Sequence, residues 1–251
     1  MKNILEVSNL SCSYGKTKIL KNINFTLNDS EKLIIIGRNG CGKSTLLKCL
    51  CNFLNYEGSI KINGLEVKNM KSKELAKNIT MLNQNEIINF DFKVKDVVGF
   101  GRYAYDNFCK KENEKIIDES LSKLNILNLK NCYMGELSGG EKQKVFISRV
   151  VAQNSKIVLL DEPNNNLDFG FYINLNQNIN TWFENKIVIS IIHDLNLVSI
   201  LNNKVMAIKE NEIYKIGNFD NDFSGEVLKN IYGFDVEKFM LSSLKKWKSR
   251  N

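Results

Sequence analysis

The sequence has one histidine, one proline and no long hydrophobic run among its 251 residues. Its longest apolar runs are far shorter than the roughly 20 residues that a membrane-spanning helix needs. They are typical instead of strands that are buried on both faces of a parallel sheet. These runs are residues 33–37, 157–160 and 187–192.

Targeting and disulfide signals are also missing. The N-terminal segment has no apolar core of secretory length, because Glu6, Ser8 and Asn9 interrupt it. The six cysteines include no C-x-x-C pair, so the pattern indicates neither a zinc ribbon nor a disulfide framework. We therefore expect a cytosolic protein with reduced thiols.

The chain is basic, with 35 Lys and Arg against 28 Asp and Glu and a net charge of +7. Such a charge is compatible with nucleic acid or an anionic membrane surface as a partner. The charges are spread along the sequence, however, and this favours an ordinary solvated surface. Only residues 244–251 are locally basic, and a short basic tail is more often disordered than functional. We expect no nucleic-acid partner.

The order of patterns along the chain predicts an α/β fold. Period-two alternation at 4–11 and 19–27 predicts an N-terminal antiparallel pair, whereas 94–153 carries mainly helical signals. Two apolar strands, 156–162 and 186–194, flank a helical stretch, which is the βαβ rhythm of a parallel sheet. A hairpin is expected to turn at Glu210 and Asn211, and a short helix and a terminal extension follow it.

Residues 37–45 carry the strongest local motif, G-x-x-x-x-G-K-[ST], directly after an apolar strand. Its glycines let successive backbone N–H groups point at phosphate oxygens, and the following helix adds the positive end of its dipole. Lys43 is expected to reach the β- and γ-phosphates, and the Ser44 hydroxyl to coordinate magnesium. The candidate ATP-binding residues of this P-loop are Gly37, Arg38, Asn39, Gly40, Cys41, Gly42, Lys43, Ser44 and Thr45.

A P-loop requires an acidic partner, and the end of the apolar run 157–160 supplies one. Asp161 is expected to hold magnesium, and the adjacent Glu162 to orient or deprotonate the attacking water. An Asp-Glu pair after a strand is common and proves little alone. Its combination with the P-loop makes it a candidate catalytic site.

Residues 136–145 contain the stretch Leu-Ser-Gly-Gly-Glu, which indicates one particular family of P-loop proteins. The sequence resembles the ATP-binding-cassette (ABC) ATPases, whose signature motif opens a helix at this place. A serine and two glycines at a helix start also form an anion-binding end. The resemblance implies that this motif faces the γ-phosphate of ATP held by a second copy of the chain. The motif residues are Leu137, Ser138, Gly139, Gly140 and Glu141.

The same resemblance assigns four further residues. It implies that Tyr14 stacks on adenine, that Gln84 touches magnesium and the attacking water, and that Asp168, in the D-loop 164–168, lies at the dimer interface. The single histidine, His193, would otherwise be a packed strand end. The resemblance makes it the switch histidine, which hydrogen-bonds the γ-phosphate and Glu162.

The resemblance predicts the architecture as well: a P-loop NTPase core with a mainly parallel sheet, an N-terminal antiparallel β subdomain and an inserted α-helical subdomain. We expect one ABC ATPase domain over 1–217, with the helical insertion at about 85–155, and a C-terminal extension over 218–251. Three motifs depart from their common patterns. The P-loop does so at Arg38 and Cys41, the signature at Glu141 and the D-loop at 164–166. None of these departures removes a reacting group.

The segment 90–105, together with 225–239, is similar to the ATPase subunits of importers for ferric siderophores, haem and cobalamin. This similarity implies a polytopic permease, a separate substrate-binding protein and a place at the cytoplasmic face of the membrane. The candidate permease contacts are Val97, Gly99, Arg102 and Tyr103. The alternative is that the aromatic residues here only pack the core of the insertion.

Two other readings stay open. One is a soluble ABC ATPase that acts on nucleic acid or in translation; the single cassette, with only 95 positions between Lys43 and Ser138, disfavours it. The other is the cytosolic cassette of iron–sulfur assembly. The chain does not distinguish iron-siderophore, haem and cobalamin as cargo.

Cys41 lies among the N–H donors of the P-loop, two positions before Lys43. Such a setting favours thiolate. The sequence therefore predicts that Cys41 is the most reactive of the six thiols.

Overall fold

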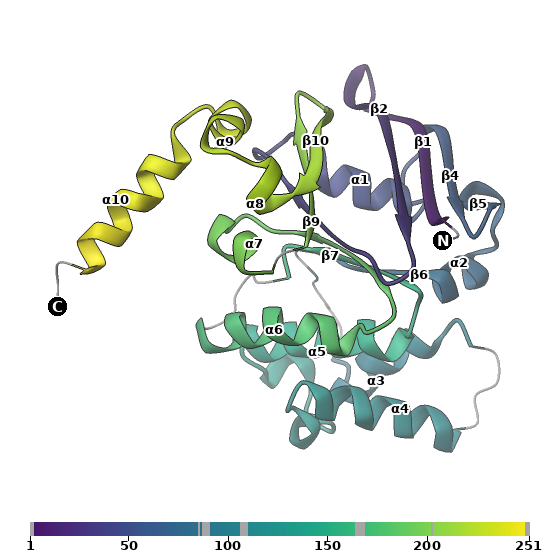
Figure 1. Cartoon of the computed structure of the whole chain (residues 1–251). Helices are drawn as coiled ribbons and strands as arrows, with labels where there is room; N and C mark the ends of the chain where they lie inside the picture. Colours follow the sequence, from purple (N-terminus) through teal and green to yellow (C-terminus); the bar gives the residue numbers. More distant parts are fainter. Residues whose placement is uncertain are drawn as a thin grey trace.

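The computed structural model describes residues 3–84, 86, 91–105, 110–163, 169–201 and 203–248. Two sheets lie side by side, with most helices below and beside them (Figure 1). The first sheet has four strands in the order β2-β1-β4-β5 and the second has six in the order β10-β9-β3-β8-β7-β6.

The first sheet is antiparallel, and its two long strands confirm the predicted N-terminal pair. Period-two alternation explains it, because Leu20, Ile23, Phe25 and Leu27 of one strand are buried while intervening residues are exposed or half-buried. The strands of this sheet are β1 (Asn3–Tyr14), β2 (Thr17–Asn28), β4 (Glu57–Ile62) and β5 (Leu65–Glu66).

In the second sheet the neighbouring strands β6, β7, β8, β3 and β9 are all parallel to one another. Its inner strands β7 and β8 are buried at every residue, as their apolar runs predict. The last strand turns back at Glu210 and Asn211, which both have positive φ angles, as predicted. The strands are β3 (Lys32–Ile36), β6 (Ile79–Leu82), β7 (Ile157–Asp161), β8 (Ile187–Ile191), β9 (Lys204–Lys209) and β10 (Glu212–Asn218).

The parallel strands are connected by helices. These are α1 (Lys43–Leu50), the 3₁₀ turn η1 (Val67–Asn69), α2 (Ser72–Asn78), α6 (Phe169–Trp182) and α7 (Leu195–Leu201). Between β6 and β7 lies the helical region that the sequence predicts. It contains α3 (Val94–Gly99), η2 (Phe100–Arg102), α4 (Lys110–Lys123), η3 (Leu127–Leu129), η4 (Met134–Glu136) and α5 (Gly139–Gln153).

The helical region shares its core with the sheet. Val97, Leu121 and Phe146 belong to one buried cluster with Val158 and Leu160 of β7. The interior is therefore continuous between the two parts, and the later turns of α5 pack against the sheet. The predicted division of the chain at residue 217 stays a prediction.

Burial corrects two of the four candidate permease contacts. Val97 is fully buried, and Arg102 is only 8% exposed. The Arg102 guanidinium donates to the Ala152 carbonyl oxygen at 2.9 Å and to Asn113 Oδ1 at 3.1 Å, so it holds the helical region together. The expectation that Val97 and Arg102 face a partner is therefore wrong. Tyr103, in contrast, is 72% exposed.

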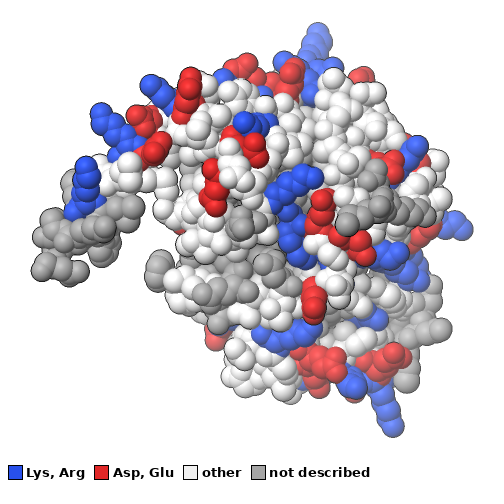
Figure 2. Space-filling view, in the orientation of Figure 1, with Lys and Arg blue, Asp and Glu red and all other residues white. Residues whose placement is uncertain are grey.

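The C-terminal part contains α8 (Phe219–Asp222), α9 (Gly225–Tyr232) and α10 (Val236–Lys248). Helix α10 continues through Lys248, so the basic segment that begins at residue 244 is helical up to that residue. On the face in Figure 2, positive and negative side chains are interspersed, as expected for a solvated surface. Within the described ranges, no helix combines the length and apolar character needed to cross a bilayer.

Candidate functional site

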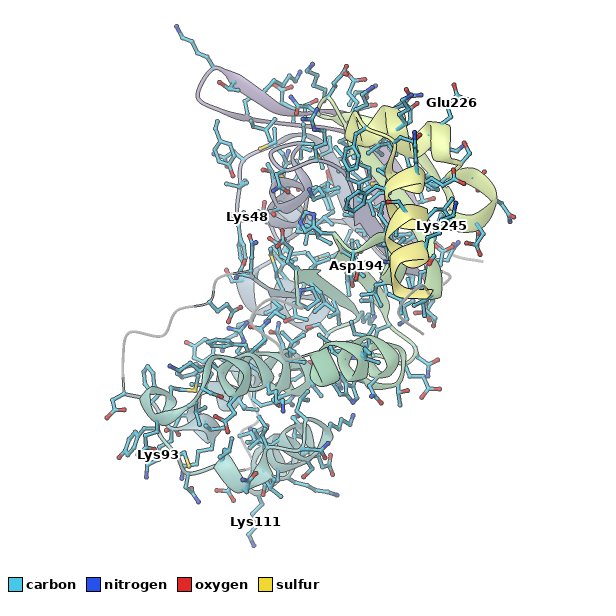
Figure 3. The ribbon with its side chains drawn as sticks, turned by 90° about the vertical axis from the view of Figure 1, so that its left-hand side faces the viewer. Lys48, Lys93, Lys111, Asp194, Glu226 and Lys245 are labelled. Carbon is cyan, nitrogen blue, oxygen red and sulfur yellow. The ribbon has the colours of Figure 1, made fainter. Side chains whose placement is uncertain are left out.

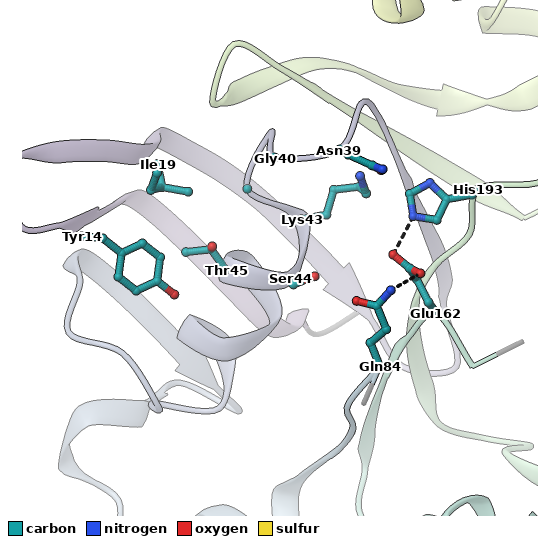
Figure 4. A pocket seen from close by; sticks show the side chains of 11 residues that line it. Tyr14, Ile19, Asn39, Gly40, Lys43, Ser44, Thr45, Gln84, Glu162 and His193 are labelled. Atoms are coloured by element: carbon teal, nitrogen blue, oxygen red, sulfur yellow. Dashed lines mark hydrogen bonds and ion pairs between the residues drawn. The ribbon is translucent and has the colours of Figure 1, made fainter. Parts of the chain in front are cut away.

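A cavity of about 690 Å³ lies at the carboxyl ends of β3, β7 and β8. The sheet puts it there, because the loops that follow neighbouring parallel strands emerge at one edge. Figure 4 shows its side chains facing a common space. The lining residues are Tyr14, Ile19, Asn39, Gly40, Gly42, Lys43, Ser44, Thr45, Gln84, Glu162 and His193.

The P-loop backbone requires glycine at two points. Gly37 and Gly42 have φ angles of 143° and 102°, and a Cβ atom on Gly42 would lie 2.7 Å from the Ile19 carbonyl oxygen. Gly42 is the N-cap of α1, and no side chain caps the helix there. The first N–H groups of α1 are therefore available to an anion.

Lys43 is held inside this loop. Its side chain is only 6% exposed, and Nζ donates to the carbonyl oxygens of Gly37 at 2.8 Å and Arg38 at 2.9 Å. An ammonium group has three N–H donors, so the loop orients it while one donor is left for a ligand. The positive charge thus lies at a fixed place beside the uncapped helix end.

Ser44 and Asp161 join the P-loop helix to β7. The Ser44 hydroxyl donates to Asp161 Oδ1 at 3.0 Å. Burial raises the pKa of the Asp161 carboxyl above its usual range; Glu162 adds to this rise, whereas the Ser44 hydrogen bond and two lysines oppose it. A bound cation would favour the charged form, so this pair is suited to a metal ion.

Glu162 is held by two neighbours from other strands. Its Oε1 atom lies 2.6 Å from His193 Nε2, and Gln84 Nε2 donates to Oε2 at 2.5 Å (Figure 4). Its backbone has φ 49°, which is unusual for a residue other than glycine. The three side chains that the sequence assigns to catalysis therefore form one hydrogen-bonded group in the cavity.

The rest of the cavity wall is less polar. Tyr14, at the end of β1, lies across the cavity from His193 (Figure 4) and presents a half-exposed ring. Ile19 lines the same side, and sequence reasoning missed it. The only available signal was its position as the first apolar residue of β2, close to Tyr14. An aromatic face beside an apolar side chain is suited to a planar base.

Some predicted residues lie elsewhere. Gly37, Arg38 and Cys41 do not line this cavity, although they belong to the loop around it. Arg38 and Cys41 line a second cavity of about 480 Å³ on the other side of the loop, next to the end of α9. Asp168 and residues 164–167 lie outside the described residues.

The five signature residues do not line the cavity either. Ser138 is the N-cap of α5 and is exposed; its backbone N–H and its hydroxyl donate to Glu141 Oε2 at 2.9 and 2.7 Å. The Glu141 backbone N–H donates in return to the Ser138 hydroxyl oxygen at 3.4 Å, which completes a capping box in which glutamate serves as well as glutamine. Gln143, one turn later, donates to the Pro163 carbonyl oxygen at 3.1 Å and so ties α5 to the loop after Glu162.

Comparison with known proteins decides the family. The family model described as ABC transporter matches residues 20–165. The chain is 33% identical over 237 residues to the petrobactin import ATP-binding protein YclP of Bacillus subtilis, covering 93% of this chain and 94% of that protein. The chain belongs to the ABC transporter family. It is an ATP-binding subunit with the fold and ATPase character of that family.

Further relatives of this ABC protein agree. It is 31% identical to the ferric enterobactin transport ATP-binding protein FepC of Escherichia coli, over 89% of this chain and 85% of that protein. A solved structure described as an inward-facing conformation of a metal-chelate type ABC transporter superposes with a TM-score of 0.77 at 29% identity, covering 91% of this chain and 88% of that chain.

The cavity fits ATP with magnesium. Uncapped N–H groups and the Lys43 charge suit phosphates, and the Tyr14 face suits adenine. Among the described residues, no group of three or more His, Cys, Asp or Glu side chains could hold a metal. Magnesium is usually bound by one or two protein ligands together with substrate phosphates, so Ser44 and Asp161 suffice.

The structure reverses the expectation for Cys41. Burial raises the pKa of this thiol, and this effect exceeds the opposing effects of Lys43 and the backbone N–H groups. Because the thiolate is the reactive form, Cys41 is expected to react with a maleimide more slowly than the half-buried Cys132 at pH 7. Its labelling should increase as the pH rises. Peptide mapping by mass spectrometry over a pH series measures this order, and early labelling of Cys41 at pH 7 would contradict it.

Proposed function

We propose that the chain is the ATP-hydrolysing subunit of a membrane importer for an iron-siderophore, haem or cobalamin. The hydrogen-bonded group of Glu162, His193 and Gln84, opposite Lys43 and Ser44, carries the hydrolytic part of this proposal. The names of relatives that import petrobactin and enterobactin support the cargo class. The proposed place of action is the cytoplasmic face of the membrane.

Each side chain has a separate task in the proposed reaction. Lys43 and the first N–H groups of α1 bind the phosphates, and Tyr14 stacks on the base. Magnesium, held by Ser44, Asp161 and Gln84, would neutralise charge on the phosphates. Glu162 accepts a proton from the attacking water, and His193 holds Glu162 in position and donates toward the γ-phosphate.

We further propose that two copies close head-to-tail around two ATP molecules. The signature end of α5, with Ser138, Gly139 and Gly140, lies outside its own nucleotide cavity, and the helix dipole there favours an anion. A second copy can bring the missing phosphate donors to this cavity. Asp168 is assigned to the same interface by resemblance.

Glu162→Gln tests the catalytic base. The amide keeps the size of the side chain but cannot take up a proton, so ATP binding should persist while hydrolysis stops. The variant should then accumulate as an ATP-bound dimer in multi-angle light scattering, while the parent returns to its nucleotide-free state. Normal hydrolysis, or no ATP-dependent dimer, would overturn the assignment.

His193→Ala tests the switch histidine. Loss of one preorganised donor typically lowers a rate by ~10²–10³, because such a group acts mainly on the charged transition state. We expect a loss of this size in kcat with little change in ATP affinity. The melting temperature without nucleotide is the control for a structural role. A lowered melting temperature with unchanged kcat would show that His193 only packs at the end of its strand and has no catalytic role.

Another groove, which shares no lining residue with the nucleotide cavity, is the proposed permease site. This cavity of about 410 Å³ lies between α2 and α5, and Phe53, Phe100 and Arg149 contribute to its wall. Phe53 is 65% exposed. Exposed aromatic side chains around a hollow are typical of a protein interface. A permease and a separate substrate-binding protein are the proposed partners.

Phe53→Asp tests this groove. We expect the parent to co-purify with a polytopic permease from detergent-solubilised membranes, and the variant to lose the permease while it still hydrolyses ATP. Leu65→Asp, an exposed apolar position on β5 outside the groove, is the matched control and should keep the partner. Recovery of the parent with only soluble iron–sulfur assembly proteins or nucleic acid would favour the alternative functions.

A further inference from the structure

The two side chains that form the less polar wall of the nucleotide cavity belong to one hairpin tip. Tyr14 is the last residue of β1 and Ile19 lies near the start of β2; we call this pair the base wall. The tip packs closely against the P-loop, because a Cβ atom on Gly42 would lie 2.7 Å from the Ile19 carbonyl oxygen and 2.8 Å from Leu20 Cδ2. The position of β2 at this point therefore sets the distance between the base wall and the phosphate-binding groups.

A bulge separates this tip from the rest of the first sheet. Leu10 pairs with Ile23, whereas Cys12 pairs with Leu20, so β2 carries one extra residue between the two pairs. Within the bulge, Asn22 has a φ angle of 46°. A bulge interrupts the ladder of hydrogen bonds and bends the strand. The pairing of β1 with β2 therefore leaves the tip in need of a further support.

The β9–β10 hairpin supplies a support from the second sheet. At the bulge, the Lys21 backbone N–H donates to the Asn211 carbonyl oxygen at 2.8 Å. On the other side of Ile19, Asn211 Nδ2 donates to the Lys18 carbonyl oxygen at 2.9 Å, across 193 positions of the sequence. The tips of the two hairpins lie next to each other above α1 (Figure 1), and Figure 3 shows α1, marked by Lys48, from a second side. One residue thus holds β2 on both sides of Ile19.

The turn itself does not require the amide of Asn211. Glu210 and Asn211 form the turn between Lys209 and Glu212, which pair with each other, and their φ angles are 53° and 71°. A two-residue turn with two positive φ angles favours glycine at its second position. Asparagine tolerates this conformation, but only its side chain reaches Lys18.

We propose that Asn211 is a positioning residue, which fixes the base wall relative to the P-loop and so raises the affinity for the base of the nucleotide. This inference rests on the proposed ATP site, in which Tyr14 stacks on adenine. Asn211 does not line that cavity, so it acts through β2. The hydrogen bond to Lys18 carries the argument, because it is the one contact that the turn does not explain.

The alternative is that these bonds only hold two hairpins together, since β10 also packs against β2 elsewhere. A purely structural role would weaken all ligands of the P-loop alike. A positioning role weakens only ligands that reach the base wall. ADP and pyrophosphate separate the two roles, because both offer phosphates to the P-loop and only ADP has a base. Their binding depends neither on hydrolysis nor on a second copy or a permease.

Asn211→Asp tests the positioning role. The substitution keeps the size of the side chain and the turn conformation but removes the donor to Lys18. We expect the Kd of ADP with magnesium to rise about fivefold to tenfold, because a hydrogen bond is lost and a carboxylate then faces a carbonyl oxygen. The Kd of pyrophosphate with magnesium should change by less than about twofold. Isothermal titration calorimetry on the full chain measures both values.

Asn63→Asp is the matched control. Asn63 lies in the turn between β4 and β5 with a φ angle of 52°, outside the cavity, so the same substitution there should leave both Kd values unchanged. Asn211→Gly is the second variant. It keeps the turn and the main-chain bond to Lys21 but has no amide, so it should weaken ADP in the same selective way even if the aspartate variant folds poorly.

Tyr14→Ala completes a double-mutant cycle. Alone it should weaken ADP and spare pyrophosphate, because it removes the larger part of the base wall. Asn211→Asp added to it should raise the Kd of ADP by less than about twofold more, since the two residues act on the same contact. Full additivity would mean that Asn211 acts by another route.

Three results would overturn the positioning role and leave the ATP site in place: equal weakening of ADP and pyrophosphate, full additivity with Tyr14→Ala, or a lowered melting temperature with both Kd values unchanged. If Tyr14→Ala leaves the Kd of ADP unchanged, the base wall itself is wrongly assigned and the inference fails with it. A chain that shows the selective loss but does not hydrolyse ATP would count against the proposed hydrolysis alone.

Discussion

The parallel pairing of β3, β8 and β7 is the constraint on which the site depends. It brings the P-loop, Glu162 and His193 to one edge of the sheet, although Lys43 and His193 are 150 positions apart in the sequence. The Ser44 hydrogen bond to Asp161 then fixes α1 against β7. A change of strand order would separate these groups, so the packing of buried apolar residues in the sheet is also what assembles the chemistry.

The helical region depends on the same sheet. Its core includes residues of β7, and Gln143 and Gln84 link it to the acidic site from two sides. The first of these contacts belongs to the signature helix, the second to the segment that enters the helical region. Displacement of the helical region is therefore coupled to the position of Glu162 through hydrogen bonds rather than through loose loops.

Prediction from sequence succeeded where a pattern has one physical interpretation. The buried strands β3, β7 and β8 follow from apolar runs. The residues around the cavity, except Ile19, follow from motifs whose order matches a family. The strand β4 was missed because Gly58 interrupts its alternation. Arg102 was assigned to a permease contact by resemblance alone. Only the structure reveals the Ala152 and Asn113 oxygens that satisfy its guanidinium in the interior. Cys41 was misjudged because burial opposes the nearby positive charge, and a sequence does not give their balance.

The backbone conformation of Glu162 affects how a substitution at this position would change the stability of the fold. Its left-handed conformation costs of order 1–3 kcal/mol for a residue with a Cβ atom. Glycine would adopt the same conformation without that cost. Selection for stability alone would thus replace this carboxylate, whereas selection for the proposed hydrolysis would retain it. The position proposed for the catalytic base is one at which the folded chain is less stable than it could be, and packing elsewhere must make up the difference.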